Sequence, residues 1–198
     1  MQIWLISDTH FFHENMYKFI GWDGVTRTRA KFTSAAEGDE YMIDAWNAVV
    51  KPEDHVWNLG DLTMERSSGS IWRIEKVMKS LNGHKRLVLG NHDHYDVRIY
   101  RNIGFEKVKG SHRFENLVYS HIPLHPEAIS SSKILANVHG HIHDRPSPEG
   151  KYVNVSVERI NYQPIPVEEV YLRAKERLGT LDKRREVTAC RFDTATPG

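Results

Sequence analysis

The stretch Ile3-Trp-Leu-Ile-Ser-Asp-Thr-His10 sets the pattern for most of the chain. Four mostly apolar residues, typical of a short buried strand, run directly into polar residues that include a carboxylate and an imidazole. The same change recurs at Val56–Leu59 before Gly60-Asp61, Leu87–Leu89 before Gly90-Asn91-His92-Asp93, Leu117–Tyr119 before Ser120-His121, and Ile134–Val138 before His139-Gly140-His141-Ile142-His143. These stretches predict buried strands that each end in a cluster of chemically active side chains.

Amphipathic segments lie between several of the predicted strands. The pattern Ser34-Ala-Ala-Glu37 is typical of a helix start, because each side chain can satisfy a free backbone N–H of the first turn. Together with apolar spacing and stop signals, it predicts helices over 34–50, 70–81 and 166–178. Strands that alternate with helices indicate an α/β protein, in which ligands bind beyond the carboxyl ends of the strands.

Two further strands and the end of the chain complete the predicted organisation. Phe105–Val108 reads as a buried strand, and Val153–Val157 alternates apolar and polar residues, which predicts a strand with one polar face. We expect one domain over 1–179, followed by a polar tail over 180–198 that is partly disordered.

The polar clusters share one ligand chemistry. Asp, His and Asn offer the oxygen and nitrogen donors that suit Mn, Fe, Zn, Co or Ni. Asp8 and His10 are two residues apart, so an extended segment would point both to the same side, and the same holds for His141 and His143. Asp61 sits on a separate strand end and can bridge. Such a set is what two metal ions about 3.5–4 Å apart require.

The motifs also come in a recognisable order: Asp-x-His, Gly-Asp, Gly-Asn-His-Asp, a lone His, and Gly-His-x-His. In this order they resemble the calcineurin-like metallophosphoesterases, and the resemblance covers Gln2 to Val157. The opening SDTHFFHEN is similar to a compact bacterial and phage-type branch of that family. The resemblance implies two mixed β-sheets packed face to face as a sandwich with helices outside, the four-layer αββα fold.

Site residues follow from the same resemblance, position by position. It implies one metal ion held by Asp8, His10, Asp61 and His143, and another held by Asp61, Asn91, His121 and His141. It implies that His92 is not a ligand but acts near the leaving group, and that Asp93 orients His92.

A chemical mechanism follows for such a site. Two cations lower the pKa of a bridging water, so that a hydroxide can attack phosphorus directly and no covalent intermediate forms. Protonated His92 would donate to the departing oxygen. We therefore expect a phosphatase or phosphodiesterase that needs two divalent first-row ions. Manganese is the expected assay metal, with Fe, Zn, Ni and Co as other candidates.

Sequence motifs identify the substrate-binding residues less clearly than the metal ligands. His13 and Arg145 are candidates for contacting a substrate phosphate, although each could also be an ordinary loop residue. Trp22 lies in a loop that could cover the site, where it would either stack on a nucleobase or pack on the fold. His55, His84, His94 and His112 are expected to be ordinary surface or strand-edge residues.

Other functions remain open. A nuclease for single strands or small oligonucleotides would use Arg27, Arg29 and Lys31 of the loop 21–40, and a cyclic nucleotide phosphodiesterase is also compatible. A non-catalytic metal-binding module is the third alternative, but the presence of His92 argues against it. The expected partner is a phosphate-ester substrate, with nucleotides and oligonucleotides among the candidates.

Composition limits these choices. The 198 residues include 27 Lys and Arg and 26 Asp and Glu, so the net charge of +1 gives no overall attraction to nucleic acid or anionic lipid. No apolar run approaches the ~20 residues that span a bilayer, and no signal peptide is expected. Cys190 alone excludes an intrachain disulfide and a cysteine-based metal site. We expect a cytoplasmic protein without a membrane or protein partner.

Overall fold

The computed structural model describes residues 1–192, and within them the strands form two mixed sheets. The first sheet has the order β4-β3-β2-β1-β9. Its strands β1 (Ile3–Ile6), β2 (His55–Asn58), β3 (His84–Val88) and β4 (Phe105–Lys109) run parallel, and β9 (Ile165–Pro166) pairs antiparallel with β1. Because the parallel strands end at the same edge, their following loops meet there.

The second sheet has the order β5-β6-β7-β8. It consists of β5 (Ser111–Phe114), β6 (Leu117–Ser120), β7 (Ala136–His139) and β8 (Tyr152–Asn154), with only β5 antiparallel to its neighbour. Trp57 of the first sheet packs on Tyr119 and His112 of the second, with ring centroids 5.9 and 4.3 Å apart. Between the sheets lies a continuous apolar core, so the predicted arrangement of two mixed sheets flanked by helices is confirmed.

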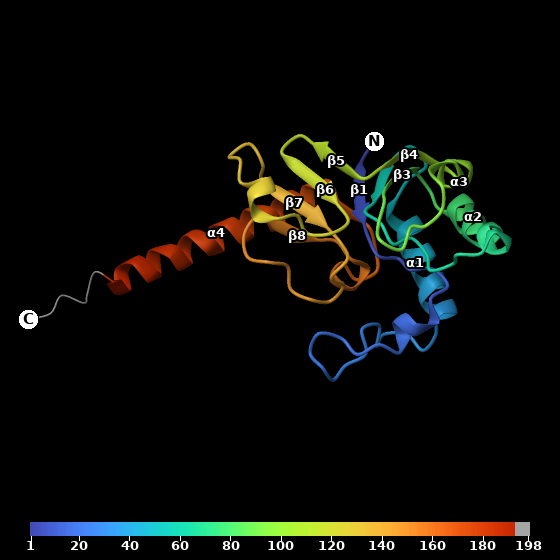
Figure 1. Cartoon of the computed structure of the whole chain (residues 1–198), viewed down its shortest axis with the longest axis horizontal. Coiled ribbons are helices and arrows are strands. Elements are labelled where there is room, and N and C mark those ends of the chain that lie inside the picture. Colours follow the sequence, from blue (N-terminus) through green and yellow to red (C-terminus); the bar gives the residue numbers. More distant parts are fainter. Residues whose placement is uncertain (193–198) are drawn as a thin grey trace, which may run out of the picture.

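Helices flank the two sheets unevenly (Figure 1). On the side of the first sheet lie α1 (Ala35–Val49), α2 (Ile71–Ser80) and α3 (Val97–Asn102), whereas α4 (Val167–Phe192) contacts β8, β9 and β1 and then projects from the body. Short 3-10 turns occur at Glu14–Tyr17 (η1), Ser68–Ser70 (η2), Pro126–Ile129 (η3) and Val157–Arg159 (η4). Within residues 1–192, no helix is both long and apolar enough to cross a membrane.

The start of α1 follows the predicted capping pattern. Ser34 is extended, and its side-chain oxygen accepts the N–H of Glu37 at 3.3 Å. The Glu37 carboxylate reaches back to the N–H of Thr33, one residue earlier than the usual capping box. Met42 and Trp46 are buried on the inner face of this helix.

Two local predictions are wrong, and three elements were not predicted. The last helix does not end at Leu178 but continues past Gly179 to Phe192, while 193–198 lie outside the described residues. β8 ends at Asn154, and the expected polar face of 153–157 is buried, because Asn154 and Ser156 turn toward the loops of the site. The strands β5 and β9 and the helix α3 were not predicted, since they are too short or too polar to show a period.

Candidate metal centre

The loops after β1, β2, β3, β6 and β7 bring the seven predicted ligands to one edge of the sheets. Six of them form two groups, within each of which the donor atoms lie within 4.8 Å of one another: Asp8, His10 and His143, and Asp61, His121 and His141. The seventh, Asn91, joins the second group, because its Oδ1 lies 2.9 Å from Nε2 of His121. The grouping matches the two ligand sets that the resemblance implies.

Asp61 lies between the two groups. Its Oδ2 is 3.5 Å from Nε2 of His10 in one group and 3.2 Å from Nε2 of His121 in the other. Its second oxygen, Oδ1, accepts the backbone N–H of His92 at 2.8 Å. One carboxylate oxygen thus faces both groups while the other fixes the loop after β3.

Left-handed backbone presents most of these side chains. Positive φ values occur at five of the seven residues: Asp8 (60°), His10 (46°), Asp61 (56°), His141 (70°) and His143 (50°). For a residue other than glycine this conformation costs roughly 1–2 kcal/mol. The expected extended segments are therefore wrong, since both pairs reach the site through turns. Asp8 and His10 lie in one group, whereas His141 and His143 lie in different groups. Backbone strain of this kind is common where function dictates side-chain direction.

Close backbone approach holds the Asp8 loop against the loop after β7. The backbone N–H of His141 donates to both carboxylate oxygens of Asp8, at 3.0 and 2.9 Å. A Cβ on Gly140 would overlap that carboxylate and the side chain of Ser7. Glycine is therefore required at this position, because any side chain would push the two loops apart.

Two of the histidines have the second ring nitrogen fixed by another group. Nδ1 of His121 donates to the carbonyl of Leu59 at 2.9 Å, and Nδ1 of His143 lies 3.2 Å from the carboxylate of Glu158. Such bonds set the tautomer and leave Nε2 as the free donor atom, as is usual for histidines that bind metals. Glu158 was not among the predicted site residues, although it follows a predicted strand just as the five polar clusters do.

Arg29 is the second residue that the sequence did not reveal. Its guanidinium is fully buried, pairs with Glu158 at 2.9 Å, and donates to the carbonyls of Asp8 and Thr9. Burial alone would raise the pKa of Glu158, but the charges of Arg29 and His143 lower it to about 2. Burial likewise disfavours charge on His143, yet Glu158 raises its pKa to about 9. This chain of charges fixes the Asp8 loop and His143 together.

Polar atoms of the site lack the partners that burial normally demands. Neither ring nitrogen of His10 has a hydrogen-bond partner among the described residues, although its side chain is only 2% exposed. Buried atoms of this kind are normally satisfied, so divalent cations in these positions fit the residues present.

The charge states of Asp61 and His10 suit a cation, whereas His143, with its raised pKa, must lose a proton to bind one. Burial would raise the pKa of Asp61, but the hydrogen bond and charge of His121 lower it to about 2. Burial, and next the charge of His143, lower the pKa of His10 well below its ordinary value. A charged carboxylate beside a neutral imidazole is the state in which both bind a metal ion.

His92 and Asp93 do not interact as expected. The carboxylate of Asp93 accepts the backbone N–H groups of Gly90, Asp61 and Leu62, at 2.8, 2.9 and 3.1 Å. Nδ1 of His92 is buried without a hydrogen-bond partner among the described residues. Asp93 therefore ties the loop after β3, which carries His92, to the loop after β2, and among the described residues no bond joins its carboxylate to the His92 ring.

With this geometry in place, comparison with known proteins is informative. The family model of the calcineurin-like phosphoesterases matches residues 1–186.

The chain belongs to the calcineurin-like phosphoesterase family.

Relatives of this chain occur in archaea and phages. An uncharacterized protein of Methanocaldococcus jannaschii, MJ1445, is 30% identical over 174 residues, which is 84% of this chain and 88% of that protein. The gene 66 protein of Mycobacterium phage L5 is 32% identical over 90 residues, or 46% of this chain and 39% of the phage protein. A protein of unknown function from Aquifex aeolicus, AQ665, has a similar fold, with a TM-score of 0.60 at 23% identity over 85% of this chain and 97% of its own.

A cavity of about 770 Å³ opens onto the candidate metal centre. Its polar wall includes His10, His92, His141 and His143, and both predicted substrate residues, His13 and Arg145, also line it. Phe19, Ile20 and Trp22 line the same cavity. Trp22 does not pack into the fold, since 61% of its surface is exposed.

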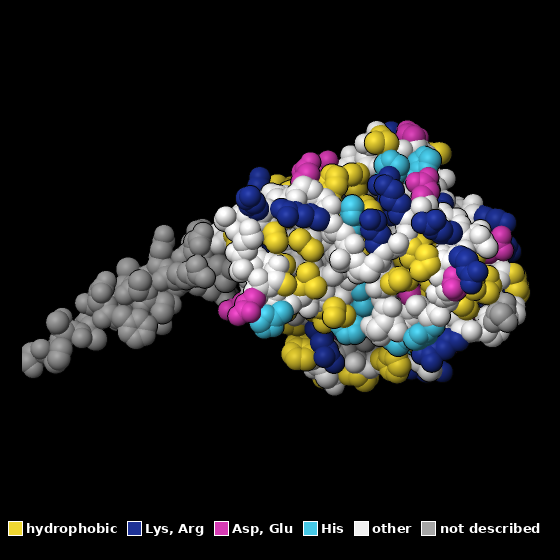
Figure 2. All heavy atoms as spheres, turned by 45° about the horizontal axis from the view of Figure 1, so that its top comes forward, with side chains coloured by type: hydrophobic (Ala, Val, Ile, Leu, Met, Phe, Trp, Pro, Cys, Tyr) yellow, Lys and Arg dark blue, Asp and Glu magenta, His cyan; other side chains and the backbone are white. Residues whose placement is uncertain are grey.

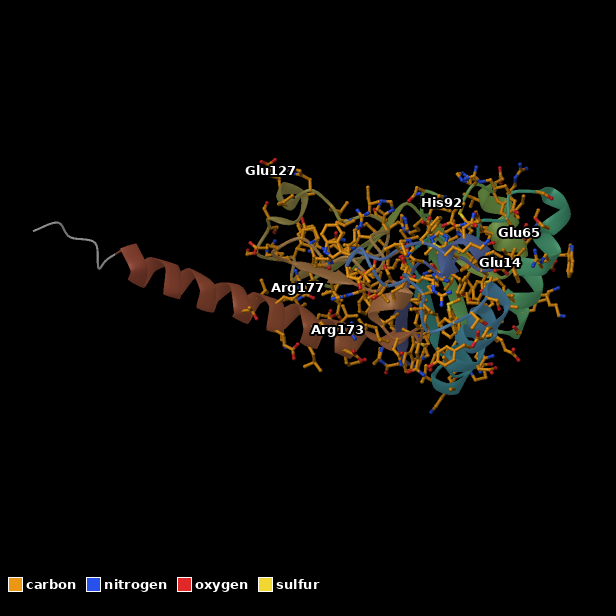
Figure 3. The ribbon with its side chains drawn as sticks, turned by 90° about the horizontal axis from the view of Figure 1, so that it is seen from below. Glu14, Glu65, His92, Glu127, Arg173 and Arg177 are labelled. Carbon is orange, nitrogen blue, oxygen red and sulfur yellow. The ribbon has the colours of Figure 1, made fainter. Side chains whose placement is uncertain are left out.

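The three basic residues predicted to contact nucleic acid have other partners in the structure. Of the three predicted contacts, Arg29 is buried, Lys31 lies 3.7 Å from the ring centroid of Tyr41, and Arg27 donates to the carbonyl of Tyr17. On the face shown in Figure 2, Lys and Arg side chains lie in several separate groups. Figure 3 places Arg173 and Arg177 along α4, well apart from His92. The expectation that Arg29 contacts nucleic acid is wrong.

A third group of potential ligands lies at the opposite edge of the first sheet. The donor atoms of His55, His84 and Glu106, at the amino ends of β2, β3 and β4, also lie within 4.8 Å of one another. His55 and His84 were expected to be ordinary surface or strand-edge residues, and no sequence pattern indicated that Glu106 would join them.

Proposed function

We propose that this protein is a phosphoesterase that depends on two divalent metal ions and hydrolyses phosphomonoesters or phosphodiesters. The main support for the proposal is the position of Asp61. Its Oδ2 atom faces one group of donor atoms on each side. A shared carboxylate of this kind is typical of two-metal sites that transfer phosphoryl groups.

The ligands divide between two positions. Asp8, His10, Asp61 and His143 would hold one ion, and Asp61, Asn91, His121 and His141 would hold the other. The donors are oxygen and nitrogen without sulfur, which suits Mn, Fe, Zn, Ni or Co. Bound there, two cations supply positive charge that polarises the phosphoryl group and lowers the pKa of water, so the reaction needs no nucleophilic side chain.

The chain's own residues contribute the proton and the alignment. His92 lines the cavity, and its backbone is tied to Asp61, so its ring lies beside the group that binds the phosphoryl end of a substrate. In its protonated form it would donate to the departing alcohol oxygen. Asp93 acts as a positioning residue, because it holds the loops of Asp61 and His92 against each other.

A nucleotide or a short single strand is the second candidate substrate. It is favoured by the exposed indole of Trp22 beside the cavity, since bases stack on such rings. Duplex nucleic acid is disfavoured, because Arg29 is buried and the Lys and Arg side chains on the face shown in Figure 2 lie in separate groups.

A direct assay tests the proposal. Protein stripped of metal and reloaded with Mn, Ni, Co or Zn is assayed on p-nitrophenyl phosphate and bis(p-nitrophenyl) phosphate, with metal content measured on the same samples. We expect about two ions per chain and hydrolysis of at least one ester. Inactive protein that holds two ions with every metal would overturn the proposal.

A further inference from the structure

The segment Phe19–Thr28, called the lip below, borders the cavity that the site histidines also line (blue in Figure 1, between β1 and α1). Two backbone bonds close it like a hairpin: Gly21 donates to Thr26 at 2.7 Å and Thr28 donates to Phe19 at 2.9 Å. At its tip, Oδ1 of Asp23 accepts the N–H groups of Val25 and Thr26. The lip is therefore a structured element with a defined shape.

The lip is docked on the loop that carries His143. The backbone N–H of Trp22 donates to Oδ2 of Asp144 at 2.7 Å. Asp144 directly follows His143, so this bond fixes Trp22 relative to the metal centre. A Cβ at Gly21 would overlap the Asp144 carboxylate, which means that the close contact depends on glycine at that position.

The lip presents apolar side chains to the cavity and not to the core. Phe19, Ile20 and Trp22 all line the cavity while 50%, 55% and 61% of their surfaces are exposed. The guanidinium carbon of Arg145 lies 5.3 Å from the centroid of the Trp22 ring. Core packing does not explain this arrangement, and exposed apolar side chains gathered at a cavity indicate a ligand-binding surface.

The size of the cavity indicates what the lip binds. Pockets for whole small molecules measure about 300–1,000 Å³, and the cavity of about 770 Å³ falls in that range. A phosphoryl group at the histidine wall would leave the lip side empty. A ligand that fills both sides carries a phosphate at one end and a flat apolar group at the other.

We infer that the preferred substrate is a phosphate ester of a nucleoside-like alcohol, whose planar aromatic ring stacks on Trp22. The inference rests on the proposed function, since it places the phosphoryl group at the metal centre. In the reaction water forms the new P–O bond and the bond to the alcohol oxygen breaks. The alcohol takes up a proton from His92, and phosphate and free nucleoside leave. Trp22 is the specificity-determining residue.

Adenosine 5′-monophosphate and ribose 5-phosphate form a matched pair of probes, because they share the same primary phosphate ester and differ only in the base. Binding of each to metal-loaded protein is measured by titration calorimetry, and kcat/KM is measured wherever turnover occurs. We expect the nucleotide to bind about tenfold more tightly than the sugar phosphate. Trp22→Ala should remove that preference while leaving the affinity for ribose 5-phosphate unchanged, and Trp22→Phe should keep part of it.

A matched control is available in Trp72 on α2, which is 63% exposed and does not line the cavity. Trp72→Ala should keep the full preference for the nucleotide. Equal affinity of the wild type for both probes overturns the inference, and so does a Trp22→Ala variant that weakens both probes equally. Either result leaves the proposed function standing if p-nitrophenyl esters are hydrolysed, so the two proposals fail separately.

Discussion

The two ends of the first sheet carry similar donor side chains, but they hold them differently. At the carboxyl end, His10 and Asp61 have side chains only 2% exposed. At the amino end, His84 and Glu106 are 49% and 44% exposed and pair with each other at 2.5 Å. A β-bulge between β3 and β4 lies beside Glu106, and such irregularities redirect side chains.

The groups that surround the donor atoms also differ between the two ends of the sheet. At the carboxyl end, Leu59 and Glu158 fix the second nitrogens of His121 and His143. At the amino end, Nδ1 of His55 is buried without a partner among the described residues, and Nε2 lies 3.4 Å from the guanidinium of Arg86. A cation beside a ligand opposes metal binding. Donor atoms thus lie close together at both ends. Only at the carboxyl end are they also buried and held by hydrogen bonds to their second ring nitrogens.

The largest expected effect is that of Asp61→Asn. Asparagine can still accept the N–H of His92, but it loses the charge that both donor groups share. We expect kcat/KM to fall on the order of a thousandfold, with fewer than two ions retained per chain. Glu106→Gln is the matched change at the amino end and should leave both quantities unchanged. Full metal content and activity in Asp61→Asn would contradict the comparison.

His92→Ala tests whether the carboxyl end does chemistry beyond holding metal. We expect full metal content and about a hundredfold slower hydrolysis of alkyl phosphate esters, whose departing oxygen needs a proton. Esters of p-nitrophenol should be much less affected, because that leaving group departs without protonation. An equal loss on both kinds of ester would mean that His92 only positions the loop.

Glu158→Gln removes the charged partner of His143, so that this histidine, like His55 at the amino end, lacks a carboxylate that supports metal binding. We expect the metal affinity to fall about tenfold to a hundredfold, because His143 loses its charged partner. The free energy of unfolding should fall by about 3 kcal/mol, since Arg29 becomes a buried charge without a charged partner. Both can be measured, by competition with a chelator and by urea unfolding.

Tyr17→Phe is the control for that variant. It removes only the weak contact between Arg29 and the Tyr17 hydroxyl, at 3.4 Å. It should lower stability slightly and leave metal affinity unchanged. If Glu158→Gln lowers stability but not metal affinity, the supporting bonds are not what distinguishes the two ends.

The smallest effect is expected at the amino end itself. In a zinc titration we expect any third ion to bind about a hundredfold more weakly than the first two, because the supporting bonds are missing. Arg86→Gln should strengthen this third site by removing the nearby cation, and His84→Ala should abolish it, both without a change in activity. Loss of a tightly bound ion in His84→Ala would contradict the expectation that the amino end binds metal weakly.

Much of the fold was predictable because its signals are local. The strands β1, β2, β3 and β6 lie within a few residues of the predicted apolar runs, and α1 begins at the predicted Ser34 cap. The strand β9 has only two residues and exists through its pairing with β1, so no periodicity could reveal it.

The candidate site was predictable as a set of residues but not as a geometry. The order of the motifs suggested all seven donors and their division into two groups. The left-handed turns at five of them were not predicted, because Asp and His tolerate that backbone only where surrounding contacts impose it. For the same reason the sequence did not predict that the carboxylate of Asp93 accepts backbone N–H groups.

The sequence by itself determined which strand ends carry donor side chains and which family the chain resembles, because apolar runs and short motifs are read within a few neighbouring residues. Only the tertiary structure decided that Arg29 meets Glu158 across 129 positions and that Trp22 docks on Asp144 across 122. Such contacts depend on the paths of whole loops. A buried charge or an exposed indole takes on its role only when the fold supplies its partner.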